Sequence, residues 1–156
     1  MAQIIIDSLD KTKKFAKILA NLLPNSMVSA IFLTGNLGSG KTTLISYLVN
    51  ELPNGCDVEV SSPSFTICNY YNTIPKILHA DLYRCSDIIP DEILEALDNK
   101  KIITIIEWAN MLEISIKPEE YLDIVLTTCE KKRLITLNAY GVNAKSLLEN
   151  ILKMYE

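Results

Sequence analysis

Residues 31–44 read Ile31-Phe32-Leu33-Thr34-Gly35-Asn36-Leu37-Gly38-Ser39-Gly40-Lys41-Thr42-Thr43-Leu44 and contain the pattern G-x-x-x-x-G-K-T. The glycines let successive backbone N–H groups turn toward an anion, Lys41 can reach the β- and γ-phosphates of a nucleotide, and the Thr42 hydroxyl can bind magnesium. An apolar run precedes the pattern, and leucines at helical spacing follow it, so a strand and a helix with its positive dipole end flank the loop. We therefore expect a phosphate-binding loop rather than an incidental glycine-rich turn.

Length and composition favour a single domain spanning residues 1–156, because 49% of the side chains are hydrophobic and the chain is too short for two cores. No apolar run approaches the roughly 20 residues of a membrane span, and the first residues lack the features of a signal peptide, so we expect a cytoplasmic protein without a membrane partner. The cysteines form no CxxC pair, which argues against a metal knuckle. A net charge of −4 argues against direct binding of DNA or RNA.

Apolar periodicity outlines the other elements. We predict strands at residues 3–6, 30–33, 64–71, 76–83, 101–107, 121–128 and 134–139, and helices at 8–23, 41–52, 90–97 and from Asn143, which caps the last one. This order predicts an α/β fold, a P-loop NTPase-like mixed sheet with helices on both faces and a C-terminal antiparallel hairpin.

Basic and aromatic residues outside the P-loop also have structural interpretations. Four lysines lie opposite the apolar stripe of the first helix and are interpreted as its solvated face: Lys11, Lys13, Lys14 and Lys17. Lys131-Lys132-Arg133 lies between two predicted strands and is interpreted as a hairpin turn rather than a nucleic-acid contact. Phe65 and Ile67 lie in a predicted strand, and we expect them to belong to the core.

Two predicted strands end in a carboxylate. These strand ends are Ile77-Leu78-His79-Ala80-Asp81 and Ile102-Ile103-Thr104-Ile105-Ile106-Glu107-Trp108. Ligands of open α/β sheets bind at the carboxyl ends of strands, so Asp81 and Glu107 are candidates to hold magnesium or to orient a water. We interpret His79, the one histidine, as a structural neighbour of the site rather than a general base.

Missing features narrow the class of P-loop protein. Asn99-Lys100-Lys101-Ile102 has isoleucine where a guanine-reading N-K-x-D motif needs aspartate. Arg84 and Arg133 are the only arginines, whereas small-molecule kinases use several to close a lid over phosphates. A small NTPase whose site is completed or controlled by a partner fits these residues better.

Four ordered motifs resemble those of the TsaE (YjeE) family, the bacterial ATPases that support threonylcarbamoyladenosine synthesis on tRNA. The motifs are Gly35-Asn36-Leu37-Gly38-Ser39-Gly40-Lys41-Thr42-Thr43, Ser61-Ser62-Pro63-Ser64-Phe65-Thr66, His79-Ala80-Asp81-Leu82-Tyr83-Arg84 and Ile106-Glu107-Trp108. The resemblance spans nearly the whole chain. One departure is Asn36, where family members usually have an acidic residue, so one negative charge near the nucleotide is lost.

The resemblance implies roles for these residues. The catalytic residues would be Lys41, Asp81 and Glu107. The residues near Mg²⁺ would be Thr42, Glu107 and Asp81. Asp81 would be either a metal-shell group or a water-positioning group. Residues 62–66 would form a switch-like loop, and the start of the first helix, with Leu9 and Asp10, would lie near the adenine. His79, Arg84 and Trp108 would lie at the edge of the site.

The resemblance also implies a function. The chain would be a Mg²⁺-dependent ATPase, slow alone, acting on a complex of TsaD-type and TsaB-type proteins, and tRNA would be reached only through that complex. Two alternatives stay open, namely a small-metabolite kinase and a nucleotide-gated binding module with negligible hydrolysis.

Overall fold

The computed structural model describes residues 1–85, 88–129 and 132–156. Its strands are β1 (Ala2–Ile6), β2 (Ala30–Gly35), β3 (Cys68–Tyr71), β4 (Lys76–Asp81), β5 (Ile102–Glu107), β6 (Tyr121–Cys129) and β7 (Lys132–Tyr140). Its α-helices are α1 (Leu9–Leu22), α2 (Lys41–Glu51), α3 (Asp91–Asp98) and α4 (Val142–Tyr155). Short 3-10 turns lie at η1 (Leu23–Asn25), η2 (Ala109–Met111) and η3 (Ile114–Ile116).

The described strands form one seven-stranded mixed sheet in the order β1-β7-β6-β2-β5-β4-β3. β2 is parallel to both β5 and β6, and β4 is parallel to β5, whereas β3, β7 and β1 add in antiparallel orientation. Register places Glu107 opposite Leu33 of β2 and opposite Asp81 of β4. The carboxyl ends of three neighbouring parallel strands thus meet at one edge of the sheet, where the P-loop begins.

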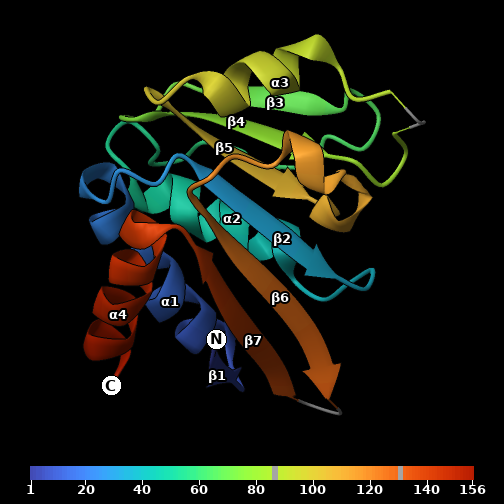
Figure 1. Cartoon of the computed structure of the whole chain (residues 1–156). Helices are drawn as coiled ribbons and strands as arrows, with labels where there is room; N and C mark the ends of the chain where they lie inside the picture. The colour runs from blue at the N-terminus through green and yellow to red at the C-terminus, as the bar shows by residue number, and fades with distance from the viewer. Residues whose placement is uncertain (86–87, 130–131) are drawn as a thin grey trace.

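Helices cover both faces of the sheet, as predicted. α1, α2 and α4 lie together on one side, while α3 lies apart from them beside β3 and β4 (Figure 1). Alternating strand residues supply the two cores, so Ile31 and Leu33 pack with the three-helix side and Phe32 packs on the α3 side. The predicted α/β fold with a C-terminal hairpin is confirmed.

The first helix follows its predicted pattern. Ser8 is its N-cap and accepts a hydrogen bond from the Lys11 backbone N–H, and Phe15 and Leu19 are buried. The lysines of the opposite face are exposed. Lys14 extends over the Tyr155 ring, with its Nζ 4.7 Å from the ring centroid, and the same Nζ donates a hydrogen bond to the Tyr155 carbonyl oxygen at 2.6 Å.

The strand predicted at 64–71 is shorter in the structure, because β3 begins only at Cys68. Ile67 has a left-handed backbone with φ 69°, which an extended strand does not allow, and its N–H bonds to the Pro63 carbonyl in a turn. Phe65 is 83% exposed, so its expected place in the core was wrong, whereas Ile67 is half-buried against the α3-side core. The alternation argument failed here because residues 64–67 do not form a strand.

The last helix has a different cap from the predicted one. Gly141 is the N-cap residue, and Asn143 lies in the first turn. The free N–H groups of Val142, Asn143 and Ala144 donate instead to the Glu120 carboxylate, which precedes β6. The prediction missed this cap because its acceptor is more than 20 residues away in the chain.

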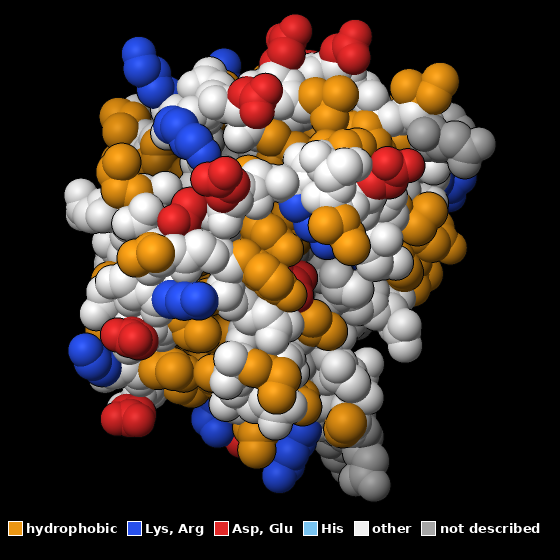
Figure 2. Space-filling view, viewed as in Figure 1, with side chains coloured by type: hydrophobic (Ala, Val, Ile, Leu, Met, Phe, Trp, Pro, Cys, Tyr) orange, Lys and Arg blue, Asp and Glu red, His pale blue; other side chains and the backbone are white. Residues whose placement is uncertain are grey.

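Positive and negative side chains are interspersed over the face drawn in Figure 2, where no continuous basic region is visible. This distribution agrees with the net charge of −4. Within the described residues, no helix is long and apolar enough to cross a membrane.

Candidate functional site: a phosphate-binding cavity

The loop between β2 and α2 has the backbone that its glycines require. Gly35 has φ 152°, and a methyl group built there would lie 2.5 Å from the Leu126 carbonyl oxygen. Gly40 caps α2 with φ 101°, a left-handed conformation that suits glycine. Lys41 folds back over the loop, and its Nζ donates to the carbonyl oxygens of Gly35 at 2.7 Å and Asn36 at 3.1 Å.

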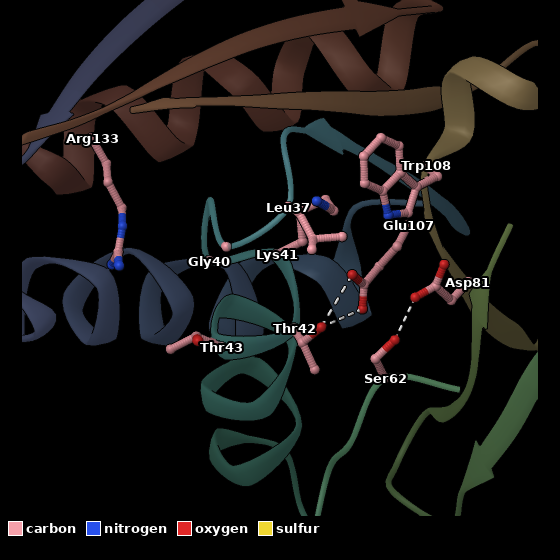
Figure 3. Close-up of a pocket in the computed structure, with 11 residues that line it drawn as sticks. Leu37, Gly40, Lys41, Thr42, Thr43, Ser62, Asp81, Glu107, Trp108 and Arg133 are labelled. Carbon is pink, nitrogen blue, oxygen red and sulfur yellow. Dashed lines mark hydrogen bonds between the residues drawn. The ribbon is translucent and has the colours of Figure 1, made fainter. Parts of the chain in front are cut away.

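A cavity of about 290 Å³ opens in front of this loop. Its lining comes from the P-loop, from the ends of β4 and β5, from the loop before β3 and from the C-terminal hairpin: Leu37, Gly38, Gly40, Lys41, Thr42, Thr43, Ser62, Asp81, Glu107, Trp108 and Arg133. These residues are drawn in Figure 3, where Thr42, Glu107, Asp81 and Ser62 converge.

The floor of the cavity is a continuous chain of hydrogen bonds. The Thr42 hydroxyl donates to Glu107 at 2.8 Å, His79 Nε2 lies 2.8 Å from the same carboxylate oxygen, and Tyr71 OH lies 2.9 Å from His79 Nδ1. Because a carboxylate only accepts, we assign the ring proton to Nε2, and Nδ1 then accepts from Tyr71. Burial raises the pKa of Tyr71, which keeps its hydroxyl protonated as this donor. These hydrogen bonds together fix the orientation of the Glu107 carboxylate.

A second carboxylate is held from the other side. Ser62 donates to one oxygen of Asp81, and the Tyr83 backbone N–H donates to the other at 2.8 Å. Asp81 is buried, and the Ser62 link ties the loop before β3 to the end of β4 (Figure 3). Any movement of this loop would therefore reach Asp81 directly.

The ammonium of Lys41 is enclosed. Its Nζ lies 4.4 Å from the centroid of the Trp108 ring, and the residue is 5% exposed. Burial lowers the pKa of Lys41, while the carboxylates of Glu107 and Asp81 act in the opposite direction. Trp108 has φ 58°, which turns its backbone sharply after β5. The ring thereby closes one side of the phosphate site.

The donor set fits magnesium. Mg²⁺ prefers oxygen ligands, keeps several waters and is commonly bound by one or two carboxylates together with substrate phosphates. Thr42, Glu107 and Asp81 bring one hydroxyl and two carboxylates to a single cavity. No cluster of three or more His, Cys, Asp or Glu that could hold a metal by itself occurs in the described part of the chain. The residues therefore suit a cation shared with a phosphate ligand.

A second cavity of about 370 Å³ lies beside the first. It is lined by the start of α1 and by the C-terminal hairpin: Ile6, Asp7, Ser8, Leu9, Thr128, Lys132 and Arg133. Leu9 thus lines a cavity next to the phosphate site, whereas Asp10 lines neither cavity. Arg133 belongs to both linings.

Comparison with known proteins decides the family. The model of the family described as "Threonylcarbamoyl adenosine biosynthesis protein TsaE" matches residues 6–135. The chain belongs to the TsaE family. The resemblance drawn from the four motifs is confirmed.

Several TsaE relatives match over much of the chain. The tRNA threonylcarbamoyladenosine biosynthesis protein TsaE of Bacillus subtilis is 33% identical over 144 residues, covering 91% of this chain and 88% of its own. The protein of the same name from Nostoc is 32% identical over 137 residues, which cover 81% of this chain and 78% of the Nostoc protein. The protein from Aquifex aeolicus is 41% identical over 88 residues, which cover 56% of this chain and 65% of the Aquifex protein. The crystal structure of Bacillus subtilis YdiB superposes with a TM-score of 0.78 at 26% identity, covering 99% of this chain and 96% of that one.

The remaining residues predicted from the TsaE motifs take varied positions. Of the switch-like loop, Ser62 lines the cavity while Phe65 points to solvent, where the Arg84 guanidinium lies 4.6 Å from its ring centroid. His79 is fully buried beneath the site, behind Glu107. The Asn36 side chain is exposed, and the residue contributes its carbonyl oxygen to Lys41.

Two residues near the TsaE site were missed by the sequence reasoning. Tyr71 carries no motif, and its bond to His79 depends on the pairing of β3 with β4. Arg133 was interpreted as part of a hairpin turn, but Lys132 and Arg133 belong to β7, while Lys131 lies outside the described residues. No local signal marks either residue, because strand pairing brings both to the site.

Proposed function

We propose that this TsaE-family chain binds and hydrolyses ATP with Mg²⁺ as an accessory subunit in the threonylcarbamoyladenosine modification of tRNA. One observation carries the proposal, namely that Lys41, Thr42, Glu107 and Asp81 share a single cavity at the P-loop. A lysine, a hydroxyl and two carboxylates around a glycine-rich loop are the parts that phosphoryl transfer to water requires.

Each residue would have a distinct task. Lys41 would leave its carbonyl partners and neutralise the β- and γ-phosphates, while Thr42 and Glu107 would hold Mg²⁺ directly or through water. When bound, the cation would neutralise charge that develops on the phosphates. Asp81 would orient the attacking water or complete the metal shell, and Ser62 would couple that carboxylate to the switch-like loop.

The partner is proposed to be a complex of TsaD-type and TsaB-type proteins. Relatives covering most of the chain are named for tRNA threonylcarbamoyladenosine biosynthesis. Hydrolysis by the chain alone should be slow, because Lys41 is the one cation proposed here to face the γ-phosphate, and the partner would complete or control the site. tRNA would be met through the complex, without direct contact to DNA, and such work places the chain in the cytoplasm.

The test is Mg²⁺-dependent ATP hydrolysis by the purified chain, alone and with the TsaD–TsaB pair. Lys41→Ala is the site variant, and Lys17→Ala, on the exposed face of α1, is the matched control. We expect slow turnover that rises with the pair, is lost in Lys41→Ala and is kept in Lys17→Ala. Turnover that depends on a phosphate acceptor without any protein partner would indicate a kinase instead. Complex assembly and tRNA modification that continue without hydrolysis would indicate a nucleotide-gated binding module.

A further inference from the structure

We propose that Arg133, from the C-terminal hairpin, binds the α- and β-phosphates of the nucleotide. The inference rests on the proposed ATP site and adds a residue outside the P-loop and outside the four motifs. Arg133, which the sequence indicated as a turn residue, would then be part of the phosphate-binding surface.

The position of Arg133 is set by strand pairing. At the start of β7, Arg133 pairs with Thr128 of β6 and with Ile6 of β1, and β6 in turn lies beside β2. This arrangement sends the side chain back toward the P-loop. A methyl group built at Gly40 would lie 3.5 Å from Arg133 Cζ and 3.6 Å from Nη1, so the guanidinium is in contact range of the residue that caps α2.

Lys41 and Arg133 flank the phosphate site. In Figure 3 the Arg133 side chain extends toward the Gly40 side of the loop, whereas Lys41 lies on the side of Trp108. The N-terminus of α2 lies between them, with its free N–H groups and positive dipole end. A polyphosphate lying along this loop would therefore be neutralised from both sides.

The two cavities indicate which phosphates Arg133 would touch. Among the described residues, it is the one that lines both the phosphate cavity and the neighbouring cavity, which Ser8 and Leu9 line. A nucleotide with its γ-phosphate at Lys41 and its base in the second cavity would pass the guanidinium where ribose joins the phosphates. The α- and β-phosphates occupy that part of the ligand.

The chemistry of the side chain supports this assignment. A guanidinium presents a planar fork of N–H donors that matches two phosphate oxygens. Among the residues that the structure describes, no carboxylate forms an ion pair with Arg133. The side chain is half-buried, so a phosphate contact there would be only partly screened by water.

The experiment is calorimetric titration of the full chain with ATP, ADP and adenosine, comparing wild type with Arg133→Ala, Arg133→Lys and the exposed-face control Lys17→Ala. For Arg133→Ala we expect the Kd of ATP and of ADP to rise together by roughly 10- to 100-fold, as for loss of a charged hydrogen-bond pair, with adenosine binding unchanged. Arg133→Lys should lie between it and wild type, because the charge stays while the fork is lost. Circular dichroism spectra establish that each variant is folded.

Three outcomes would overturn the proposal. If Arg133→Ala and Arg133→Lys bind both nucleotides as wild type does, Arg133 is a solvated hairpin residue and the ATP site itself stands. If only ATP binding weakens, the guanidinium contacts the γ-phosphate rather than the inner phosphates. If wild type binds neither nucleotide, the proposed function fails together with this inference.

Discussion

Replacing His79 with leucine tests whether the buried chain of hydrogen bonds behind the site holds Glu107 in place. His79 is fully buried, and it joins Tyr71 to Glu107 through contacts of 2.9 Å and 2.8 Å. Leucine has a similar volume and cannot form hydrogen bonds. The substitution therefore leaves the Tyr71 hydroxyl without its partner and removes one donor from the Glu107 carboxylate, which keeps Thr42.

The expected cost follows from these two losses. A hydrogen bond to a charged group contributes about 1.5–3 kcal/mol, and a buried hydroxyl without a partner costs about 1–3 kcal/mol. The sum is about 2.5–6 kcal/mol of unfolding free energy, which lowers the Tm of a chain of this size by roughly 5–24 °C. Tyr71→Phe removes only the outer bond and should cost about 1–2 kcal/mol.

Chemical denaturation of wild type, His79→Leu, Tyr71→Phe and the double variant measures these terms. Once His79 is gone, Tyr71→Phe should cost less than it does in wild type, by about 1 kcal/mol or more, because the hydroxyl has already lost its partner. A cost below about 1 kcal/mol for His79→Leu, together with equal effects of Tyr71→Phe in both backgrounds, would show that these hydrogen bonds contribute nothing to stability.

Three further predictions concern the P-loop, the tryptophan and the last helix. Gly35→Ala should abolish nucleotide binding in titration calorimetry, because a methyl group there would lie 2.5 Å from a backbone carbonyl oxygen of β6. Gly38 has open space around it but φ 75°. Gly38→Ala should therefore weaken nucleotide binding by about tenfold or less, through backbone strain of about 1 kcal/mol. ATP should change the fluorescence of Trp108, the single tryptophan, because phosphate draws Lys41 from its position 4.4 Å above the ring; unchanged emission at saturating ATP would refute this movement. Glu120→Ala should lower the unfolding free energy by about 1 kcal/mol at pH 7, the effect of losing a helix cap, as measured by urea denaturation. Burial raises the pKa of Glu120, but its backbone and Asn143 donors together lower it below 4.5. The capping contribution is therefore fully present well above pH 4.5 and is lost as pH falls through the lowered pKa. An effect of Glu120→Ala that does not diminish at any acidic pH at which the protein still folds would contradict this account.

The parts of the fold and site that contiguous motifs carry could be predicted from the sequence. Glycine spacing in the P-loop dictates the backbone, and an apolar run ending in a carboxylate places Glu107 at the edge of a parallel sheet. Strand order then brings Asp81 alongside it, in the register that the structure gives. In these segments local propensity and tertiary packing favour the same conformation.

The remaining features depend on contacts between distant segments. Arg133 reaches Gly40 only because β7 pairs with β6 and β6 lies against β2. Glu120 caps α4 across more than 20 residues, which no local capping rule can detect. Phe65 was misplaced for a different reason, since its segment alternates like a strand but turns at residue 67 before the sheet begins.

The pairing of β1 with β7 has a consequence for synthesis on the ribosome. β1 precedes the other described strands in the chain and leaves the exit tunnel before them, yet the strand it pairs with spans Lys132–Tyr140. At about 5–20 residues per second, the first strand waits roughly 7–26 s for that partner. During this time its apolar residues Ile4 and Ile6, buried in the finished sheet, have no strand to cover them. The newly made β1 segment thus keeps apolar side chains unpaired until the hairpin emerges, and the second cavity, which Ile6 and Arg133 both line, forms only after that point.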